Sequence, residues 1–219
     1  HNCYLRLEEK LSRLSKNDVR NIYVIVESIY SMDGDVCHLR EIQKVCEKFK
    51  AHLIVDEAHA VGVMGKNGQG LVVSLSLQDK IFCRVVTFGK AFGASGAAIL
   101  ASNTVKNYLV NFCSSFIYTT APSAFVYLNI SSVIDWLISK EFIVERQRLT
   151  SNIGYMNQTL GIENKTPIYP FVFGSVGGLR DISISLRENK ISCTPIFPPT
   201  VRRGYERLRV CIHSLNSRE

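Results

Sequence analysis

The feature that most constrains the fold lies in the first part of the chain. There, short apolar runs alternate with a segment whose apolar residues recur at the spacing of a helix. Residues 21–28 (NIYVIVES) are rich in β-branched side chains and are typical of a strand. Residues 35–50 repeat apolar side chains at the spacing of an amphipathic helix, which we expect Asp35 to cap. A second apolar run, residues 53–55, ends directly in Asp56. This order predicts an α/β fold with a mainly parallel, doubly wound sheet, whose strands end at a common edge.

The later part of the chain predicts a second, smaller domain. Up to residue 161 we expect strands at residues 82–88 and 96–102, a helix at 104–111, an extended segment at 114–120 and a helical stretch at 122–161. A weak break near Lys140 and Glu141 predicts a boundary, with residues 1–140 in the larger domain and residues 141–219 in a C-terminal α+β domain.

Charge and cysteine content limit the compartment and the partners. The 26 Lys and Arg residues outnumber the 19 Asp and Glu residues, but they are scattered, which favours an anionic cofactor or substrate over nucleic acid. The 7 cysteines form no CxxC pair and mostly lie in apolar runs, as in proteins of a reducing compartment. No apolar run approaches the roughly 20 residues of a membrane span. We therefore expect a cytoplasmic protein with no membrane or nucleic-acid partner.

The stretch Leu53–Gly62, LIVDEAHAVG, fits two unrelated classes of enzyme. In an ATP-driven nucleic-acid motor, Asp-Glu-Ala-His after an apolar strand holds Mg²⁺ and water beside the nucleotide. Such a motor also requires a GxxxxGK[ST] phosphate loop, which the 219 residues do not contain. Because a preceding segment could supply that loop, the motor hypothesis stays open at this point.

The second class uses the carboxylate at one strand end together with an amine at the next. Asp56 and Lys90 each follow an expected strand, so both would meet at the same edge of a parallel sheet. A lysine there can form a Schiff base with pyridoxal phosphate, while an aspartate pairs with the pyridinium nitrogen. Taken singly, Lys90 is typical of a solvated loop, Asp56 of a helix N-cap and His59 of a core histidine.

Five segments together resemble the α-oxoamine synthase family of fold-type I pyridoxal phosphate enzymes. They are ESIYSMDGD, DEAHAVGVMGKNGQG, TFGKAFGASGAA, FIYTTAPSA and FPPTVRRGYERLRVCIHS, and they span essentially all 219 residues. The resemblance implies that residues 1–140 are part of the cofactor-binding major domain. It also implies that the chain is a fragment without the family's N-terminal part, which carries the ring-stacking aromatic residue and a phosphate loop.

The resemblance assigns the ring-side contacts of the cofactor to one strand edge and its loops. It implies that Lys90 is the Schiff-base lysine and proton carrier, and that Asp56 is the partner of the ring nitrogen. His59 would hydrogen-bond the phenolic oxygen with help from Ser31. Glu27 is implied near the site.

The resemblance assigns the remaining contacts to phosphate and substrate. Thr87 would contact the cofactor phosphate, and Thr119 and Thr120 would reach the phosphate of the partner subunit in a homodimer. Arg209 would bind the carboxylate of the amino-acid substrate, a task suited to a bidentate guanidinium. No metal ligand is expected.

The implied reaction is a decarboxylative condensation of an amino acid with an acyl-CoA. The run TFGKAFG followed by SGAA most resembles members that join L-alanine to pimeloyl-CoA, giving 8-amino-7-oxononanoate for biotin biosynthesis. Related alternatives are synthases of the glycine C-acetyltransferase, serine palmitoyltransferase and 5-aminolevulinate synthase types. Two further hypotheses stand beside this one: the nucleic-acid motor, and a folded fragment without catalytic activity.

Overall fold

The structure, a computed structural model, describes residues 1–14 and 21–217. These residues form two compact units, which are described separately. The first unit comprises His1–Ile29 and Cys37–Ile143, and the second comprises Tyr30–Val36 and Val144–Glu219. The sequence did not predict that the short segment Tyr30–Val36 packs with residues that follow it by more than a hundred positions.

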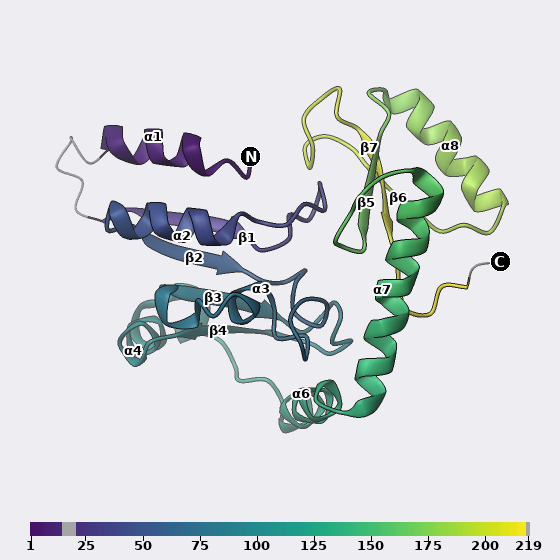
Figure 1. The fold of residues 1–219 in the computed structure, drawn as a ribbon. Helices are drawn as coiled ribbons and strands as arrows, with labels where there is room; N and C mark the ends of the chain where they lie inside the picture. Colours follow the sequence, from purple (N-terminus) through teal and green to yellow (C-terminus); the bar gives the residue numbers. More distant parts are fainter. Residues whose placement is uncertain (15–20, 218–219) are drawn as a thin grey trace. The chain divides into compact units, whose positions relative to one another are not determined.

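The first unit is built on a mixed, mostly parallel sheet (Figure 1). Its described strands are β1 (Tyr23–Glu27), β2 (His52–Asp56), β3 (Cys83–Thr87) and β4 (Ala97–Ala101), in the order β1-β2-β3-β4. β1, β2 and β3 are parallel, whereas β4 runs antiparallel to β3. The connection from β3 to β4 is too short for a crossover helix, so β4 must turn back. The predicted α/β class with a mainly parallel sheet is confirmed.

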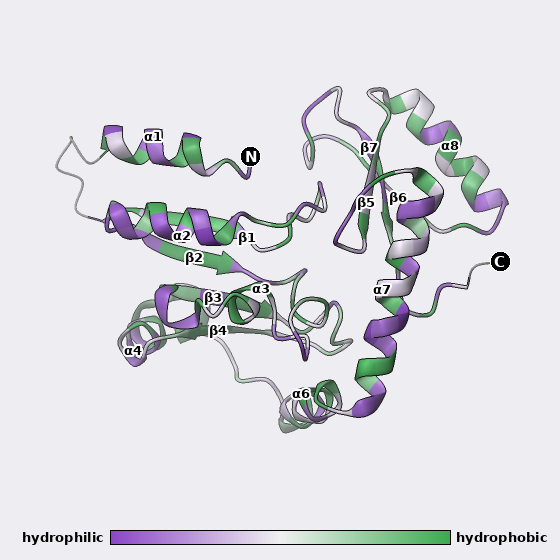
Figure 2. Ribbon diagram, in the orientation of Figure 1, coloured by the Kyte–Doolittle hydropathy of each residue, from purple (hydrophilic) through white to green (hydrophobic). Residues whose placement is uncertain are grey.

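The two faces of this sheet differ in burial. Val24, Val26, Leu53 and Val55 alternate along β1 and β2 and are buried on one face. There α2 (Leu39–Lys48) packs on β2 with four apolar side chains, and α1 (Tyr4–Leu14) lies beside α2. On the other face the described residues leave apolar side chains exposed: Tyr23 by 53%, Ile25 by 71% and Ile99 by 51%. In Figure 2 the strands are coloured mainly as hydrophobic.

Further helical elements complete the first unit. They are α3 (Leu71–Ser74), the 3₁₀ turn η1 (Gln78–Lys80), α4 (Asn103–Phe112), α5 (Ser114–Ile117) and α6 (Ala124–Leu137). The next helix, α7 (Lys140–Leu160), begins in the first unit and continues into the second.

Two local predictions are wrong: the capping role of Asp35 and the extended segment at residues 114–120. In both places the backbone groups make their hydrogen bonds within turns. Asp35 does not cap α2. Its carbonyl accepts a hydrogen bond from the Tyr30 amide at 3.0 Å, and the helix begins later, with His38 as its N-cap residue. Residues 114–120 are not extended, since the amides of Phe116 and Ile117 both donate to the Cys113 carbonyl and close a helical turn. This turn supplies the hydrogen bonds that a strand would need from a neighbouring strand.

The second unit is a small α+β domain, as predicted for the C-terminal part of the chain. Its described strands β5 (Ile168–Val172), β6 (Thr194–Ile196) and β7 (Arg207–Cys211) form an antiparallel sheet with β7 in the middle. α8 (Val176–Glu188) packs on β6 and β7. Tyr169 of β5 is buried, and its hydroxyl donates to Asn157 of α7 at 2.8 Å.

No helix among residues 1–14 and 21–217 combines the length and the apolar character needed to cross a membrane.

Candidate active site

The carboxyl-terminal edge of β2 and β3 carries the residues on which the chemical prediction rests. Asp56 ends β2 and is paired in register with Val85 of β3. Thr87 ends β3 two positions later, so its side chain leaves the sheet on the same face as that of Val85. Residues paired in register face the same way, so Asp56 and Thr87 share one face of the sheet. Lys90 lies in the exposed turn that follows.

The loops that leave the two strands touch each other. Gly62, in the loop after Asp56, has φ = +80°, a conformation that side-chain-bearing residues rarely adopt. A Cβ atom at Gly62 would lie 2.5 Å from the Cβ atom of Ala91, the residue after Lys90. The structure therefore brings the Asp56 loop and the Lys90 loop into contact, and only a glycine at position 62 permits this approach.

Asp56 is held at the strand end by backbone hydrogen bonds. Its carbonyl oxygen accepts from the Ser28 amide at 2.8 Å and from the Ser28 hydroxyl at 3.1 Å. Its carboxylate Oδ1 accepts from the Ala58 amide at 2.8 Å, which is the local turn typical of aspartate. Glu27 of β1 is the register partner of Asp56 and lies at the same edge. His59 lies in the turn that follows Asp56.

The Thr87 hydroxyl is the unsatisfied polar group of this edge. Its Oγ1 atom is buried and has no hydrogen-bond partner among the residues that the structure describes. Buried hydroxyls almost always have a partner, so this hydroxyl leaves a donor and an acceptor for a ligand or a water molecule.

Glu57 follows Asp56 and has a structural role that the sequence did not predict. Its carboxylate is fully buried, where it accepts from Nε of Arg84 at 2.7 Å, from Nη2 of Arg84 and from the Val72 amide at 2.9 Å. Gly70 packs directly against it, since a Cβ there would lie 2.6 Å from a carboxylate oxygen. Glu57 therefore fixes the glycine-rich loop to β3. A carboxylate engaged in this way does not fit the role of a Mg²⁺ or water ligand in a nucleic-acid motor.

Two other predicted residues, Ser31 and Arg209, belong to the second unit. Arg209 lies on β7, and its Nη1 donates to the Ser31 carbonyl at 3.1 Å. Arg207, two positions earlier, is buried and pairs with Asp33 at 2.7 Å. The resemblance implied a role for Arg209 alone, and the sequence could not show that Arg207 and Arg209 differ in burial.

Thr119 and Thr120 lie in the exposed turn after α5. The Thr119 hydroxyl donates to the Phe116 carbonyl at 2.8 Å, a contact within the turn. The predicted task of both threonines at a subunit interface remains a prediction.

Comparison with known proteins now supplies the family. The sequence profile of the family described as Aminotransferase class I and II matches residues 1–219. The chain belongs to this family. It is 36% identical to an 8-amino-7-oxononanoate synthase of Vibrio atlanticus (strain LGP32) over 225 aligned residues, which cover 100% of the chain and 53% of that relative. The chain thus spans about half the length of the curated relatives it matches.

Two solved structures share the fold of this chain. A serine palmitoyltransferase variant from S. paucimobilis with a bound PLP–myriocin aldimine matches with a TM-score of 0.89 and 25% identity, over 100% of this chain and 56% of that one. An 8-amino-7-oxononanoate synthase from Francisella tularensis matches with a TM-score of 0.78 and 27% identity, over 95% of this chain and 62% of that one. These similarities confirm the predicted resemblance to α-oxoamine synthases and the fold-type I class.

Proposed function

We propose that this chain carries part of the catalytic machinery of a pyridoxal phosphate-dependent acyltransferase. The proposed reaction condenses L-alanine with pimeloyl-CoA, with loss of carbon dioxide and coenzyme A, to give 8-amino-7-oxononanoate in biotin biosynthesis. The observation that carries the proposal is the placement of Asp56 and Lys90 after two adjacent parallel strands whose loops touch. The 8-amino-7-oxononanoate synthases among its relatives support the choice of substrates.

The residues at this edge fit pyridoxal phosphate. The unpaired Thr87 hydroxyl is a donor suited to a phosphate oxygen, and Asp56 still has a carboxylate oxygen for a pyridinium N–H beyond the one that Ala58 engages. His59 would donate to the phenolic oxygen, with Ser31 assisting and Glu27 nearby. When bound, the cofactor supplies an aldehyde that takes up an amine and a protonated ring that withdraws electrons from the attached carbon.

The residues of this chain then bind the substrate and move its proton. The Asp56 carboxylate favours the protonated ring nitrogen, because a nearby negative charge stabilises the cationic form. Lys90 would hold the cofactor through its Nζ atom, and its free amine would be the base for the proton on the α-carbon of the amino acid. Arg209 binds the substrate carboxylate through guanidinium N–H groups other than the one that Ser31 engages.

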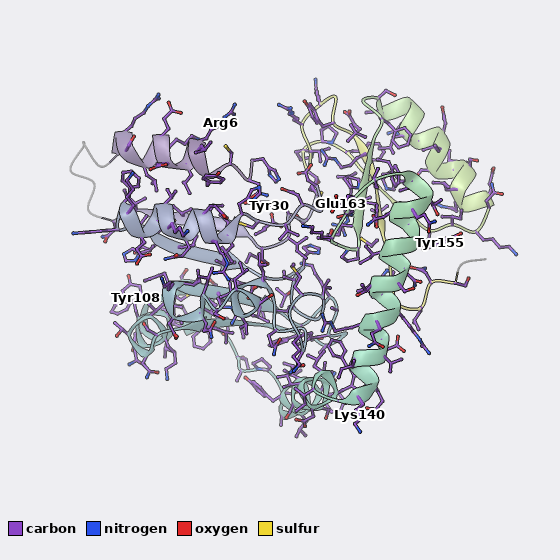
Figure 3. All side chains as sticks on the ribbon, in the orientation of Figure 1. Arg6, Tyr30, Tyr108, Lys140, Tyr155 and Glu163 are labelled. Carbon is purple, nitrogen blue, oxygen red and sulfur yellow. The ribbon has the colours of Figure 1, made fainter. Side chains whose placement is uncertain are left out.

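We propose a homodimer in the cytoplasm as the working form. Large apolar side chains are exposed on α4 and α6, among them Tyr108, Phe112, Phe125 and Leu128, and Tyr108 is labelled in Figure 3. Exposed apolar side chains of this size favour a subunit interface. Thr119 and Thr120, between these helices, would contribute to the phosphate site of the partner subunit. All seven cysteines are free thiols, which suits a reducing compartment.

The test is made on the full-length protein. Purified with pyridoxal phosphate, it should show a visible absorbance band that Lys90→Ala abolishes and that Lys80→Ala, an exposed lysine at the other end of β3, leaves intact. A band that persists in Lys90→Ala contradicts the assignment. Turnover is then measured with alanine, glycine and serine against pimeloyl-, acetyl-, succinyl- and palmitoyl-CoA. Turnover that requires serine and palmitoyl-CoA would favour the serine palmitoyltransferase type and overturn the proposed substrates.

A further inference from the structure

The segment Tyr30–Val36, which begins at the labelled Tyr30 in Figure 3, is anchored to the second unit at several points. It folds back on itself, because the Tyr30 amide donates to the Asp35 carbonyl at 3.0 Å and the Gly34 amide donates to the Tyr30 carbonyl at 2.7 Å. The buried Thr166 hydroxyl donates to the Gly34 carbonyl at 2.6 Å. Gly34 has φ = +74° and packs directly against the Ile168 carbonyl, so no larger residue fits there.

Arg207 and Arg209 complete this anchoring from the middle strand of the sheet. The two arginines are two positions apart on β7 and therefore project from the same face. Arg207 is almost fully buried and donates from Nη1 to the Asp33 carboxylate at 2.7 Å and to the Met32 carbonyl at 2.9 Å. Its Nε donates to the Tyr205 carbonyl at 3.1 Å. These contacts leave Arg207 no exposed guanidinium face for a substrate.

Arg209 is held differently. Its bond to the Ser31 carbonyl, at 3.1 Å, is the one hydrogen bond that its guanidinium makes within the described part of the chain. A guanidinium has five N–H donors, so one bond orients the group and leaves a bidentate edge for a carboxylate. The position of the Ser31 carbonyl is set by the next two residues of the segment, Met32 and Asp33, which Arg207 holds.

We infer that Arg207 and Asp33 are positioning residues for the amino-acid site. Their ion pair fixes the Ser31 carbonyl, and this carbonyl in turn holds Arg209 in the orientation that receives the substrate carboxylate. The inference rests on the proposed function, in which Arg209 binds that carboxylate. The inference adds that Asp33, which contacts neither substrate, affects the affinity for the amino acid and not the affinity for the acyl-CoA.

The test uses the full-length protein with pyridoxal phosphate and follows the visible absorbance of the cofactor as L-alanine is added. Asp33→Asn should raise the dissociation constant for L-alanine about tenfold, the size typical of residues coupled in one hydrogen-bond network, and leave KM for pimeloyl-CoA within about twofold. Asp33→Glu keeps the charge and should restore part of the affinity. Asp181→Asn removes the same charge from an exposed position on α8 and serves as the matched control.

A double-mutant cycle distinguishes positioning from general damage. If Asp33 acts through Arg209, then Asp33→Asn should change the L-alanine affinity of an Arg209→Lys variant by less than about twofold. Amide hydrogen exchange gives a readout that does not depend on activity. Asp33→Asn should accelerate exchange in a peptide covering residues 30–36, whereas Asp181→Asn should not.

Two results overturn the inference. Additive effects in the cycle, or equal losses of affinity for both substrates, would show that Asp33 does not act through Arg209, and the proposed function would still stand. If the wild-type protein gives no absorbance response to any amino acid, the proposed function fails and the inference fails with it.

Discussion

Asp56 and Glu57 are adjacent acidic residues with opposite surroundings. Asp56 lies at the strand edge with a carboxylate oxygen engaged by Ala58, whereas Glu57 is buried between Arg84 and the glycine-rich loop. Removing one partner of a buried ion pair leaves an uncompensated charge, which costs about 3–5 kcal/mol. We therefore expect Glu57→Ala to lower the free energy of unfolding by about 3 kcal/mol, measured by urea denaturation.

The matched substitution at the neighbouring position should separate stability from chemistry. Asp56→Asn keeps the side-chain size and an acceptor for the Ala58 amide, so it should change the free energy of unfolding by less than about 1 kcal/mol. It should nevertheless weaken catalysis strongly, because the ring nitrogen loses its anionic partner. A large loss of stability in Asp56→Asn, with full activity, would contradict both assignments.

Cys46 on α2 gives a prediction about pH. Burial raises the pKa of its thiol from the ordinary value of 9.0 to about 11. In the unfolded chain the thiol therefore loses its proton first, so the unfolded state binds fewer protons than the folded state between these values. The free energy of unfolding should fall as the pH rises from about 9 towards 11. Cys46→Ala should flatten this part of the profile, and an unchanged slope would contradict the stated cause.

Side-chain partners that are far apart in the sequence could not be predicted from local patterns. The two-residue period of a strand could have placed Glu57 on the face opposite to Asp56. Its partner Arg84 lies 27 positions away, and only the pairing of β2 with β3 identifies it. The roles predicted for Lys90, Thr87 and Arg209 came from the family resemblance, which assigned no role to Arg207, and the partner of Arg207, Asp33, lies 174 positions earlier in the chain.

Ser139 shows how one side chain divides a helical stretch into two elements. Its hydroxyl accepts from the Phe142 amide at 3.3 Å, in the manner of an N-cap for α7. Ser139→Ala should lower the free energy of unfolding by about 1 kcal/mol, and Ser139→Asp should retain most of it. The measurement is thermal unfolding, with Ser132→Ala on the exposed side of α6 as the control. Equal effects at both serines would exclude a capping role.

The elements that could be predicted were those with strong local patterns. The strands from Tyr23 to Asp56 and the amphipathic α2 follow apolar periodicity. Two features could not be predicted from apolar periodicity: the helical turn at residues 114–117 and the packing of Tyr30–Val36 in the second unit. Both depend on backbone hydrogen bonds, which leave no periodic pattern in the sequence. β4 is antiparallel because its connection to β3 is short, and the apolar pattern of a strand does not indicate its direction.

At the scale of the whole molecule, the exposed apolar face of the first sheet predicts association. Residues 1–219 produced alone should bind an apolar dye and self-associate, because contiguous exposed apolar surface favours contact with other molecules. Ile25→Thr together with Ile99→Thr should reduce both effects, measured by dye fluorescence and light scattering. In the full-length protein the same pair should instead lower the free energy of unfolding if that face is covered. Undiminished dye binding in the double variant would locate the association elsewhere.

Because Tyr30–Val36 packs in the second unit, the two units do not correspond to two continuous stretches of the gene. The chain passes between its units three times, after Ile29, after Val36 and after Ile143, so no single cleavage separates two complete pieces. A genetic exchange that replaced everything beyond residue 143 would join a foreign strand to Asp33 and Gly34, without the Arg207 and Thr166 that match them. We therefore expect substitutions in residues 30–36 to be tolerated best when the late residues that hold this segment change as well, although the gene encodes the two parts far apart.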